Sequence, residues 1–331
     1  MCEFCRSLSK MMRIVYMGTP EFAVAPLKRL VEGGYKVVAV VTMPDKAAGR
    51  GLKMQASAVK QYALSVGIPV LQPEKLKETD FVETFRALRP DLGIIIAFRM
   101  LPEVIWSVPR LGTFNLHASL LPQYRGAAPI NRAIMAGETR TGVTTFLLNH
   151  EIDRGDILGQ CDVDILPDDN AGTLHDKLMV AGTELVIETV EKIAARRAAP
   201  IAQPALAEGV PLREAPKIFK GDCRIDWRCD TATIRNLIRG LSPCPAAWTE
   251  FADGHAEPFP VKIFTAQIEA APLPVEQPAP GTILTDGKNF LQVVCGDGIL
   301  AIEALQPSGK RRMSVAEWLR GFTLSPGARF V

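Results

Sequence analysis

Residues 114–131 read F-N-L-H-A-S-L-L-P-Q-Y-R-G-A-A-P-I-N, and the expected fold and chemistry of the chain follow from this stretch. Asn115 and His117 stand two positions apart in a segment whose composition favours a strand leaving a sheet. Because a strand directs residues i and i+2 to the same face, the Asn115 amide and the His117 imidazole are expected to point into one space. The S-L-L-P sequence that follows suits no regular element, so residues 119–122 are expected to form a loop beside that space.

A second polar motif lies in residues 144–157, which read T-T-F-L-L-N-H-E-I-D-R-G-D-I. An alternating strand here runs out into a polar turn that carries Asp153, with Gly155 two positions later. Asp153 is the carboxylate expected to partner the His117 imidazole. Taken singly, each residue has a structural alternative: a histidine near a strand end is more often a hydrogen-bonded structural residue, Asn115 can satisfy backbone groups, and Asp153 can be an Asx-turn residue.

The joint order N-x-H-x-S-L-L-P-x-x-R-G-A-A-P, followed later by I-D-x-G-D, is far more specific than either part. At these residues the chain resembles the methionyl-tRNA formyltransferase family, within the larger group of folate-dependent formyl-transferring enzymes. The resemblance covers nearly everything from Arg13 onward. It implies a one-carbon group transferase that moves the formyl group of 10-formyltetrahydrofolate to the α-amino group of methionyl initiator tRNA, giving N-formylmethionyl-tRNA for translation initiation.

The resemblance implies that Asn115, His117 and Asp153 are the catalytic residues. The Asn115 amide and a protonated His117 would stabilise the oxyanion of a tetrahedral intermediate, while Asp153 orients the imidazole. The attacking α-amino group titrates near neutrality, so it needs little activation; no metal is expected, and the folate is a co-substrate. Residues 98–101 are expected to line the same cleft and to hold the pterin. The residues expected to bind folate are Ser119, Leu120, Leu121 and Pro122.

The N-terminal part of the chain predicts an α/β fold. From Arg13 it reads R-I-V-Y-M-G-T-P-E-F, an apolar strand followed by a turn and a helix, which is a Rossmann-like opening. Only Gly18 is present where a dinucleotide fingerprint needs three glycines, so binding of NAD or FAD is disfavoured. Residues 91–98 read D-L-G-I-I-I-A-F, a continuous apolar run typical of a central parallel strand covered on both faces. A capping box is expected at Thr173 and Asp176, at the start of a long amphipathic helix.

A loop rich in glycine and positive charge lies between Asp45 and Lys60. In it Arg50 stands between Gly49 and Gly51, which leave the backbone free to change conformation. A solvated surface loop is the structural alternative. The resemblance favours a basic arm that contacts tRNA, and it assigns Arg50 as the tRNA-binding residue.

The composition shifts between residues 200 and 216, where prolines recur without helical or strand periodicity, which indicates an extended linker. Beyond it the pattern changes to short strands separated by hairpin signals, and this predicts a small β-barrel of the OB type. A helix with a capping box is expected after Ser314, completed by Glu317. The expected division is an N-terminal extension at 1–12, a Rossmann-like formyltransferase domain at 13–197, a linker at 198–214 and an OB-like tRNA-binding domain at 215–331.

The composition sets broad limits. A chain of 331 residues with 47% hydrophobic content can bury one large core and a smaller second one. Its 38 basic and 36 acidic residues are too evenly balanced to reveal a nucleic-acid partner, so tRNA contacts must come from local basic patches. The seven cysteines lack the spacing of a disulfide framework, and Cys2 and Cys5 lack a second ligand pair for zinc. This cysteine usage favours a reducing, cytoplasmic setting. The chain has no apolar run long enough for a membrane and no signal-peptide pattern, so no membrane partner is expected. The protein is expected to be a monomer.

Three alternative functions stay open. The acceptor can be a small amine such as glycinamide ribonucleotide or an amino sugar, although the second domain and the basic loop favour tRNA. A hydrolase that releases the formyl group to water would need neither Arg50 nor the barrel. A non-catalytic nucleic-acid-binding protein would have no use for intact Asn115, His117 and Asp153.

Overall fold

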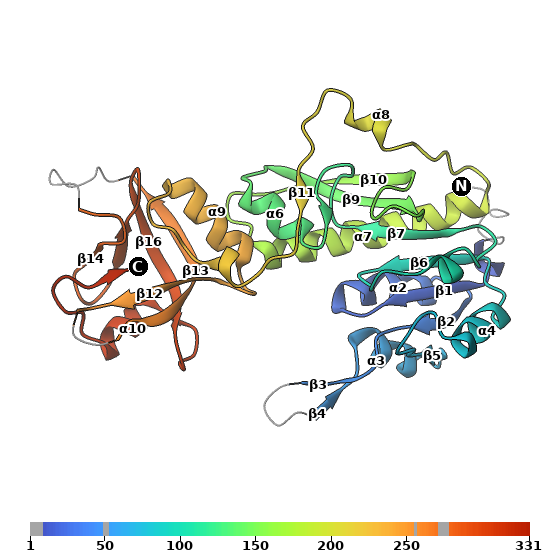
Figure 1. The fold of residues 1–331 in the computed structure, drawn as a ribbon, viewed down its shortest axis with the longest axis horizontal. Helices are drawn as coiled ribbons and strands as arrows, with labels where there is room; N and C mark the ends of the chain where they lie inside the picture. Colours follow the sequence, from blue (N-terminus) through green and yellow to red (C-terminus); the bar gives the residue numbers. More distant parts are fainter. Residues whose placement is uncertain (1–8, 49–52, 255–256, 271–277) are drawn as a thin grey trace. The chain divides into compact units, whose positions relative to one another are not determined.

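The computed structural model describes residues 9–48, 53–254, 257–270 and 278–331, which form two compact units (Figure 1). The predicted tRNA contact Arg50 and the cysteine pair Cys2 and Cys5 lie outside the described residues. The first unit consists of the described parts of Met1–Gly126, Arg140–Asp164 and His175–Glu214, and the second of Ala127–Thr139, Ile165–Leu174 and the described parts of Ala215–Val331. The chain therefore passes between the units several times, and the predicted boundaries at 13, 198 and 215 stay a prediction.

The first unit is built on a seven-stranded sheet of order β10-β9-β7-β6-β1-β2-β5, which confirms the expected Rossmann-like fold. Five strands are parallel and two antiparallel strands extend one edge. All residues of β1 and β6 are buried, as expected for strands covered on both faces. The strands are β1 (Ile14–Gly18), β2 (Val37–Val41), β5 (Val70–Leu71), β6 (Leu92–Ile96), β7 (Thr113–His117), β9 (Arg140–Leu147) and β10 (Ile157–Asp164).

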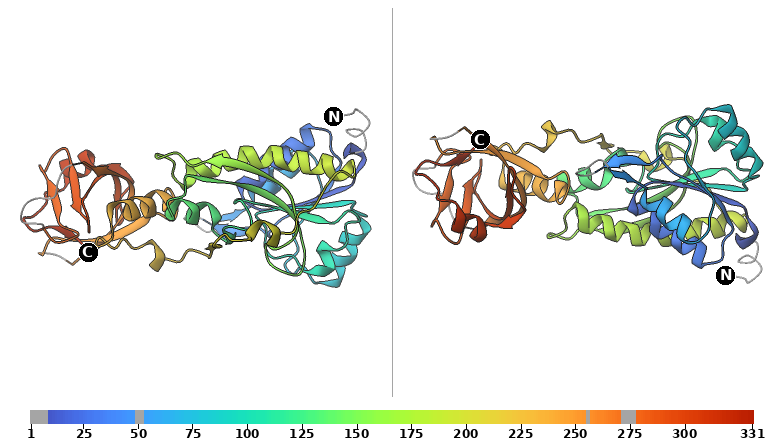
Figure 2. Two further views of the ribbon diagram at one scale, coloured as in Figure 1. Left: turned by 90° about the horizontal axis from the view of Figure 1, so that it is seen from above. Right: turned by 90° about the horizontal axis from the view of Figure 1, so that it is seen from below.

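Helices cover both faces of this sheet, with α7 along one face and α4 on the opposite face (Figure 2). On the α4 side, Val15 and Met17 pack with Phe85 in one apolar core. On the α7 side, Gly182 lies against Leu116 of β7. The helical elements of this unit are η1 (Glu21–Ala23), α2 (Val24–Glu32), α3 (Ala58–Ser65), α4 (Thr79–Ala87), α5 (Glu103–Trp106), most of α7 (Ala171–Ala194) and α8 (Pro204–Ala207).

The start of α7 differs from the prediction. The capping box expected at Thr173 and Asp176 is wrong, because α7 already begins at Ala171 and Asn170 caps it. Asn170 Oδ1 accepts the amide protons of Gly172 and Thr173 at 2.8 and 3.1 Å. Because Asn170 Oδ1 accepts these backbone donors, the helix begins at Ala171, three residues earlier than a cap at Thr173 would place it.

The basic segment ahead of α3 also contains structure that the sequence pattern did not predict. The short strands β3 (Lys46–Ala48) and β4 (Lys53–Gln55) pair as an antiparallel hairpin. At its base, Lys60 Nζ lies 2.7 Å from Asp45 Oδ2.

The second unit contains a nearly closed antiparallel barrel, which confirms the OB-type prediction. Its strand order is β14-β15-β16-β13-β12-β18, and β17 pairs with β16. A bridge between Thr282 and Arg329 joins the two ends of this order, and Phe330 N donates to Gly281 O at 2.8 Å. The strands are β12 (Ala247–Ala252), β13 (Phe259–Glu269), β14 (Ile283–Thr285), β15 (Leu291–Val294), β16 (Ile299–Pro307), β17 (Met313–Ser314) and β18 (Arg329–Phe330).

Aromatic side chains fill the barrel. Trp227 stacks on Phe330 with ring centroids 5.7 Å apart, and the Trp227 indole donates to Thr249 Oγ1 at 3.0 Å. The buried indole N–H is thus satisfied, so the large ring can be buried without leaving an unpaired donor.

The short elements β8 (Arg125–Gly126) and β11 (Glu214–Ala215) lie next to the points where the chain changes unit. The remaining helical elements are α6 (Pro129–Met135), η2 (Gly221–Cys223), α9 (Thr231–Leu241) and α10 (Val315–Gly321).

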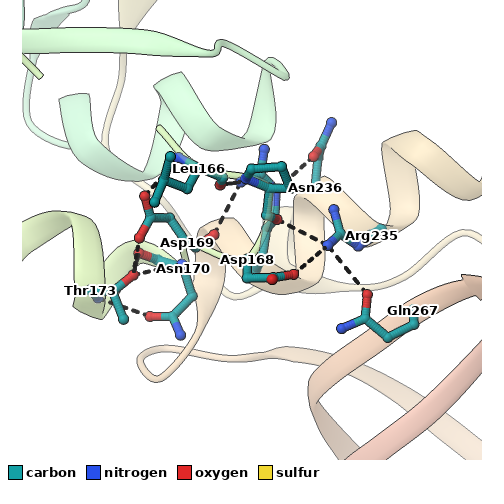
Figure 3. Close-up of polar contacts among 10 residues, drawn as sticks. Leu166, Asp168, Asp169, Asn170, Thr173, Arg235, Asn236 and Gln267 are labelled. Carbon is teal, nitrogen blue, oxygen red and sulfur yellow. Dashed lines mark hydrogen bonds and ion pairs between the residues drawn. The ribbon is translucent and has the colours of Figure 1, made fainter. Parts of the chain in front are cut away.

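Arginines of α9 fix the segment Ile165–Leu174 inside the second unit (Figure 3). Arg235 Nη2 donates to Pro167 O at 2.9 Å and lies 3.3 Å from Gln267 Oε1 on β13. Arg239 Nη1 donates to Asp169 O at 3.0 Å. Burial and the neighbouring Arg235 lower the pKa of Arg239. Carbonyl oxygens that a loop cannot pair by itself are thus satisfied by guanidinium groups.

In the described part of the chain, no helix combines the length and the apolar character that crossing a bilayer requires. The described residues also bring together no group of three or more His, Cys, Asp or Glu side chains suited to a metal ion.

Candidate active site

The predicted pair Asn115 and His117 lies at the carboxyl end of β7, at one edge of the first unit's sheet. β1, β6 and β7 end there side by side, since Gly18 pairs in register with Ile96 and Ile95 with Asn115. The strand order reverses between β1 and β6, and in open α/β sheets ligands bind outside the carboxyl ends at such a point. The described chain therefore presents the predicted pair at the edge where this fold class binds its ligands.

One nitrogen of His117 is committed to the protein. The side chain is 7% exposed, and Nε2 lies 2.9 Å from Tyr124 O. A carbonyl oxygen can only accept, so Nε2 carries a proton in this contact, which assigns the tautomer of the neutral ring. Nδ1 is then the nitrogen left for chemistry: it accepts a proton when the ring is neutral and donates one when the ring is charged.

Among the described residues, three side-chain polar atoms are buried without a hydrogen-bond partner, and all belong to β7 or to the loops that follow β1 and β6: Asn115 Oδ1, Thr19 Oγ1 and Arg99 Nε. A buried polar group left unpaired costs roughly 1–3 kcal/mol, so it is uncommon away from functional sites. Thr19 directly follows β1 in the Gly-Thr-Pro turn. Sequence reasoning used this turn only to predict the fold, although a polar residue right after a central parallel strand is the signal that identifies it.

Gly18 allows this edge to close tightly. A Cβ added there would lie 2.7 Å from Ala23 Cβ and 3.0 Å from Ile96 O. The glycine therefore serves the close approach of β1 to its neighbours, a role that is separate from dinucleotide binding.

Asp153 lies in the turn between β9 and β10 with a positive φ of 54°. Its Oδ2 accepts the amide proton of Gly126 at 3.1 Å. Among the described residues, no hydrogen bond joins this carboxylate to the His117 imidazole, so their predicted pairing stays a prediction. The two groups are instead held by one short segment, because Tyr124 offers its carbonyl to His117 and Gly126, two positions later, offers its amide to Asp153.

Gly155 completes the same turn. A Cβ added at this position would lie 1.5 Å from Leu147 O, so any other residue would push β9 and the turn apart. The glycine of the I-D-x-G-D motif is thus required by packing.

The predicted folate-binding loop at 119–122 is rigidly held. Thr144 Oγ1 donates to Ser119 O at 2.7 Å and accepts from Leu121 N at 3.0 Å, while Gln160 Nε2 donates to Leu121 O at 2.7 Å. Ser119, Leu121 and Pro122 are buried, and the Ser119 hydroxyl donates to Gln123 O at 2.6 Å. Of the four predicted folate contacts, only the Leu120 side chain is partly exposed.

A cavity of about 600 Å³ opens between the loops that follow β5 and β6. Arg99 joins these loops, since its guanidinium donates to Pro73 O at 2.6 Å and to Glu74 O at 2.7 Å. Within the predicted wall 98–101, Arg99 and Met100 line the cavity, whereas Leu101 is buried in the apolar core. Among the described residues, the full lining is Leu76, Lys77, Arg99, Met100, Pro102, Glu103 and Val104, and it includes none of the predicted catalytic residues.

Comparison with known proteins identifies the class. Residues 12–190 match the model of the formyl transferase family, and residues 217–323 match that of the formyl transferase C-terminal domain. The chain therefore belongs to the formyl transferase family.

Two relatives with the same name align with almost the whole chain. It is 55% identical to the methionyl-tRNA formyltransferase of Bacteroides thetaiotaomicron over 96% of this chain and 97% of that protein. It is 56% identical to the methionyl-tRNA formyltransferase of Bacteroides fragilis over 95% of this chain and 96% of that protein. The resemblance expected from residues 114–156 is thereby confirmed.

Solved structures at lower identity share the fold. HypX from Aquifex aeolicus in complex with tetrahydrofolic acid aligns with a TM-score of 0.62 at 20% identity, covering 93% of this chain and 47% of that one. The N-formyltransferase from Helicobacter canadensis, in complex with folinic acid and dTDP-3-aminofucose, aligns with a TM-score of 0.63 at 17% identity, covering 92% and 100%.

Proposed function

We propose that this chain transfers the formyl group of 10-formyltetrahydrofolate to the α-amino group of methionyl initiator tRNA. The observation that carries the proposal is the placement of Asn115 and His117 at the carboxyl edge of the sheet, in a chain at least 55% identical over both units to two methionyl-tRNA formyltransferases. The product, N-formylmethionyl-tRNA, serves translation initiation.

The chemistry is acyl transfer. The amine nitrogen attacks the formyl carbon and forms a tetrahedral intermediate with a negative oxygen; collapse then breaks the bond to the folate nitrogen, which leaves with a proton. Because Nε2 of His117 donates to Tyr124 O, a charged imidazole has Nδ1–H free to donate to the oxyanion. The Asn115 amide is the second donor, and the role proposed for the Asp153 carboxylate is to orient the imidazole. No step in this scheme needs a metal.

The folate site is proposed at the same edge. The rigid loop of Ser119, Leu120, Leu121 and Pro122 forms one wall, which suits the positioning of a co-substrate whose formyl carbon must meet the amine in a fixed geometry. The unpaired Thr19 Oγ1 at the end of β1 supplies a further polar contact.

The tRNA is proposed to contact Arg50 and the second unit. Around Trp248, Lys220 Nζ lies 5.5 Å and Arg224 Cζ 5.4 Å from the ring centroid, and Lys217 lies 5.6 Å from the ring of the exposed Phe219. Cations interleaved with aromatic rings suit a nucleic-acid backbone. A second basic cluster on this unit consists of Lys310, Arg311 and Arg312, in which Arg311 pairs with Glu317 and Arg312 Cζ lies 4.5 Å from the centroid of the Phe264 ring.

The test is formyl transfer from 10-formyltetrahydrofolate to charged initiator tRNA by the purified chain. Uncharged initiator tRNA, charged elongator tRNA, glycinamide ribonucleotide and a nucleotide-linked amino sugar are the controls. Selective formylation of the charged initiator supports the proposal, whereas faster transfer to either small amine, or release of formate alone, would reject it.

We further propose that the enzyme is a cytoplasmic monomer without a membrane partner. The molar mass measured by gel filtration with light scattering tests the oligomeric state.

A further inference from the structure

The segment 198–214, expected as an extended linker, is tied to the first unit near the active site. Ile201 exchanges two backbone hydrogen bonds with Ile157 at the start of β10, at 2.8 and 2.9 Å. Two residues later Gln203 is fully buried, although its neighbours on both sides are exposed. A buried glutamine in an otherwise exposed segment needs partners for its amide.

The Gln203 amide is saturated. Its Nε2 donates to Asp153 O at 2.9 Å and to Gly155 O at 2.8 Å. Its Oε1 accepts from Arg125 Nε at 3.0 Å and from Nη2 of the same guanidinium at 2.5 Å. Both donors and both lone pairs are used, and since carbonyls only accept and the guanidinium only donates, the orientation of the amide follows.

These bonds hold the Asp153 turn by its backbone, while the Asp153 carboxylate accepts separately from Gly126 N at 3.1 Å. Asp153 has a positive φ, a conformation that is uncommon outside glycine, although Asp adopts it more readily than most residues; Gln203 and Arg125 both donate to its carbonyl oxygen. Arg125, which donates to Gln203 Oε1, also donates to Asp153 O at 3.2 Å. It directly follows Tyr124, whose carbonyl accepts from His117. Gln203 therefore links the segment that holds the imidazole to the turn that carries the carboxylate.

The same segment makes a second tie beside His117. Tyr124 N donates to Arg213 O at 2.7 Å, and Gln123 Nε2 donates to Pro211 O at 2.9 Å. Gln123 Oε1 in turn accepts from Arg213 N at 2.8 Å. The segment 198–214 therefore contacts residues 123–126 at two places, through Gln203 and through residues 211–213.

We infer that Gln203 is a positioning residue for formyl transfer, acting through Asp153 and without touching the substrates. The inference rests on the proposed function, because it assigns a role within the same site. Loss of the amide lets the Asp153 turn relax, and a misplacement of about 1 Å in a catalytic group costs on the order of a hundredfold in rate. The effect falls on kcat, since nothing that binds folate or tRNA is removed.

The experiment is a double-mutant cycle with Gln203→Ala and Asp153→Asn, read by single-turnover formyl transfer at saturating tRNA and folate. Gln203→Ala is expected to lower kcat by tenfold or more, with both KM values within about twofold of wild type, and to have little further effect when Asp153 is already Asn. Gln203→Glu keeps the shape of the side chain and an acceptor for Arg125 but loses both N–H donors. It should therefore lower kcat as much as Gln203→Ala does, and it replaces the alanine variant if that variant does not fold. Glu208→Gln, exposed in the same segment, is the control.

An equal rate loss with and without the Asp153 carboxylate, or a near-normal kcat for both Gln203 variants, would overturn the inference and make Gln203 a structural residue only. A wild-type chain that formylates no charged initiator tRNA would instead reject the proposed function, so the two failures are separate. Thermal unfolding of each variant identifies a loss of rate that comes from unfolding.

Discussion

The His117 imidazole divides its two nitrogens between structure and chemistry. Nε2 donates to the Tyr124 carbonyl, so ring position and tautomer are set before any substrate binds. Asn115, two residues earlier on β7, adds a buried oxygen that lacks a partner among the described residues. The local sequence predicted that these side chains share a face, and the Tyr124 contact explains how the ring is held there.

We expect His117→Ala and Asn115→Ala each to lower kcat by roughly a hundredfold or more, because each removes one donor to the oxyanion. Both KM values should change much less. Single-turnover transfer at saturating substrates is the measurement, and His150→Ala, whose side chain is 72% exposed, is the matched control. A near-normal rate for His117→Ala would remove this histidine from the mechanism.

Arg50 is predicted to select initiator over elongator tRNA. In the sequence it stands between two glycines, whose backbone freedom suits a side chain that must fit tRNA. Arg50→Ala should lower kcat/KM for charged tRNA, while folate affinity measured without tRNA stays unchanged. Arg110→Ala, exposed elsewhere on the first unit, is the control. An equal loss of folate affinity would assign the loop to the folate site instead.

Among the elements, helix starts show how local chemistry succeeds and fails as a predictor. The capping box of α10 is confirmed, with Ser314 Oγ accepting the Glu317 amide at 3.2 Å and Glu317 Oε2 accepting the Ser314 amide at 2.9 Å. At α7 the expected box was displaced by Asn170, whose side chain is one of several good caps in the sequence N-A-G-T. When two residues within three positions can both cap a helix, the sequence does not decide at which residue the helix begins, and the conformation of the preceding turn does.

The α10 cap predicts a pH dependence. The Ser314 amide, and then the Arg311 guanidinium, lower the pKa of Glu317 from 4.5 to about 2. As the pH falls, the unfolded chain therefore takes up this proton first, so the cap's contribution to stability is complete above about pH 4.5 and is lost on approaching pH 2. Thermal unfolding should show Glu317→Gln less stable than wild type at pH 6, with the gap closing toward pH 2. A gap independent of pH, or an equal gap for Glu303→Gln on β16, would contradict this origin.

For the molecule as a whole, binding of tRNA is predicted to draw on charges of the second unit. Replacing Lys220 and Arg224 together by Gln should raise KM for tRNA and lower its salt dependence by about one unit of log–log slope per lost phosphate contact. kcat should stay near wild type, because neither residue belongs to the catalytic site. KM measured against salt concentration is the test, with Arg320→Gln on α10 as control, and an unchanged KM would move the tRNA contact elsewhere.

Charge substitutions are preferable to truncation for this question. Ala127–Thr139 and Ile165–Leu174 precede the predicted linker in sequence but group with the residues after it. Removing everything beyond residue 203 would leave Ile165–Leu174 without Arg235 and Arg239. It would also leave Ala127–Thr139 without Gly240, whose carbonyl accepts from Asn131, and without the apolar core against which Met135 packs. Reduced activity after such a cut would report unfolding as well as lost tRNA contacts.

The sequence by itself determined what depends on neighbours within a few residues. Apolar runs predicted β1 and β6, spacing by two placed Asn115 and His117 on one face, and Ser314 with Glu317 predicted a cap, since backbone stereochemistry acts locally. Tertiary structure alone decided the burial of Gln203, fifty positions from Asp153, and the carbonyl that holds His117. A buried amide or imidazole takes whichever partner packing brings within about 3 Å, and no local pattern records that choice.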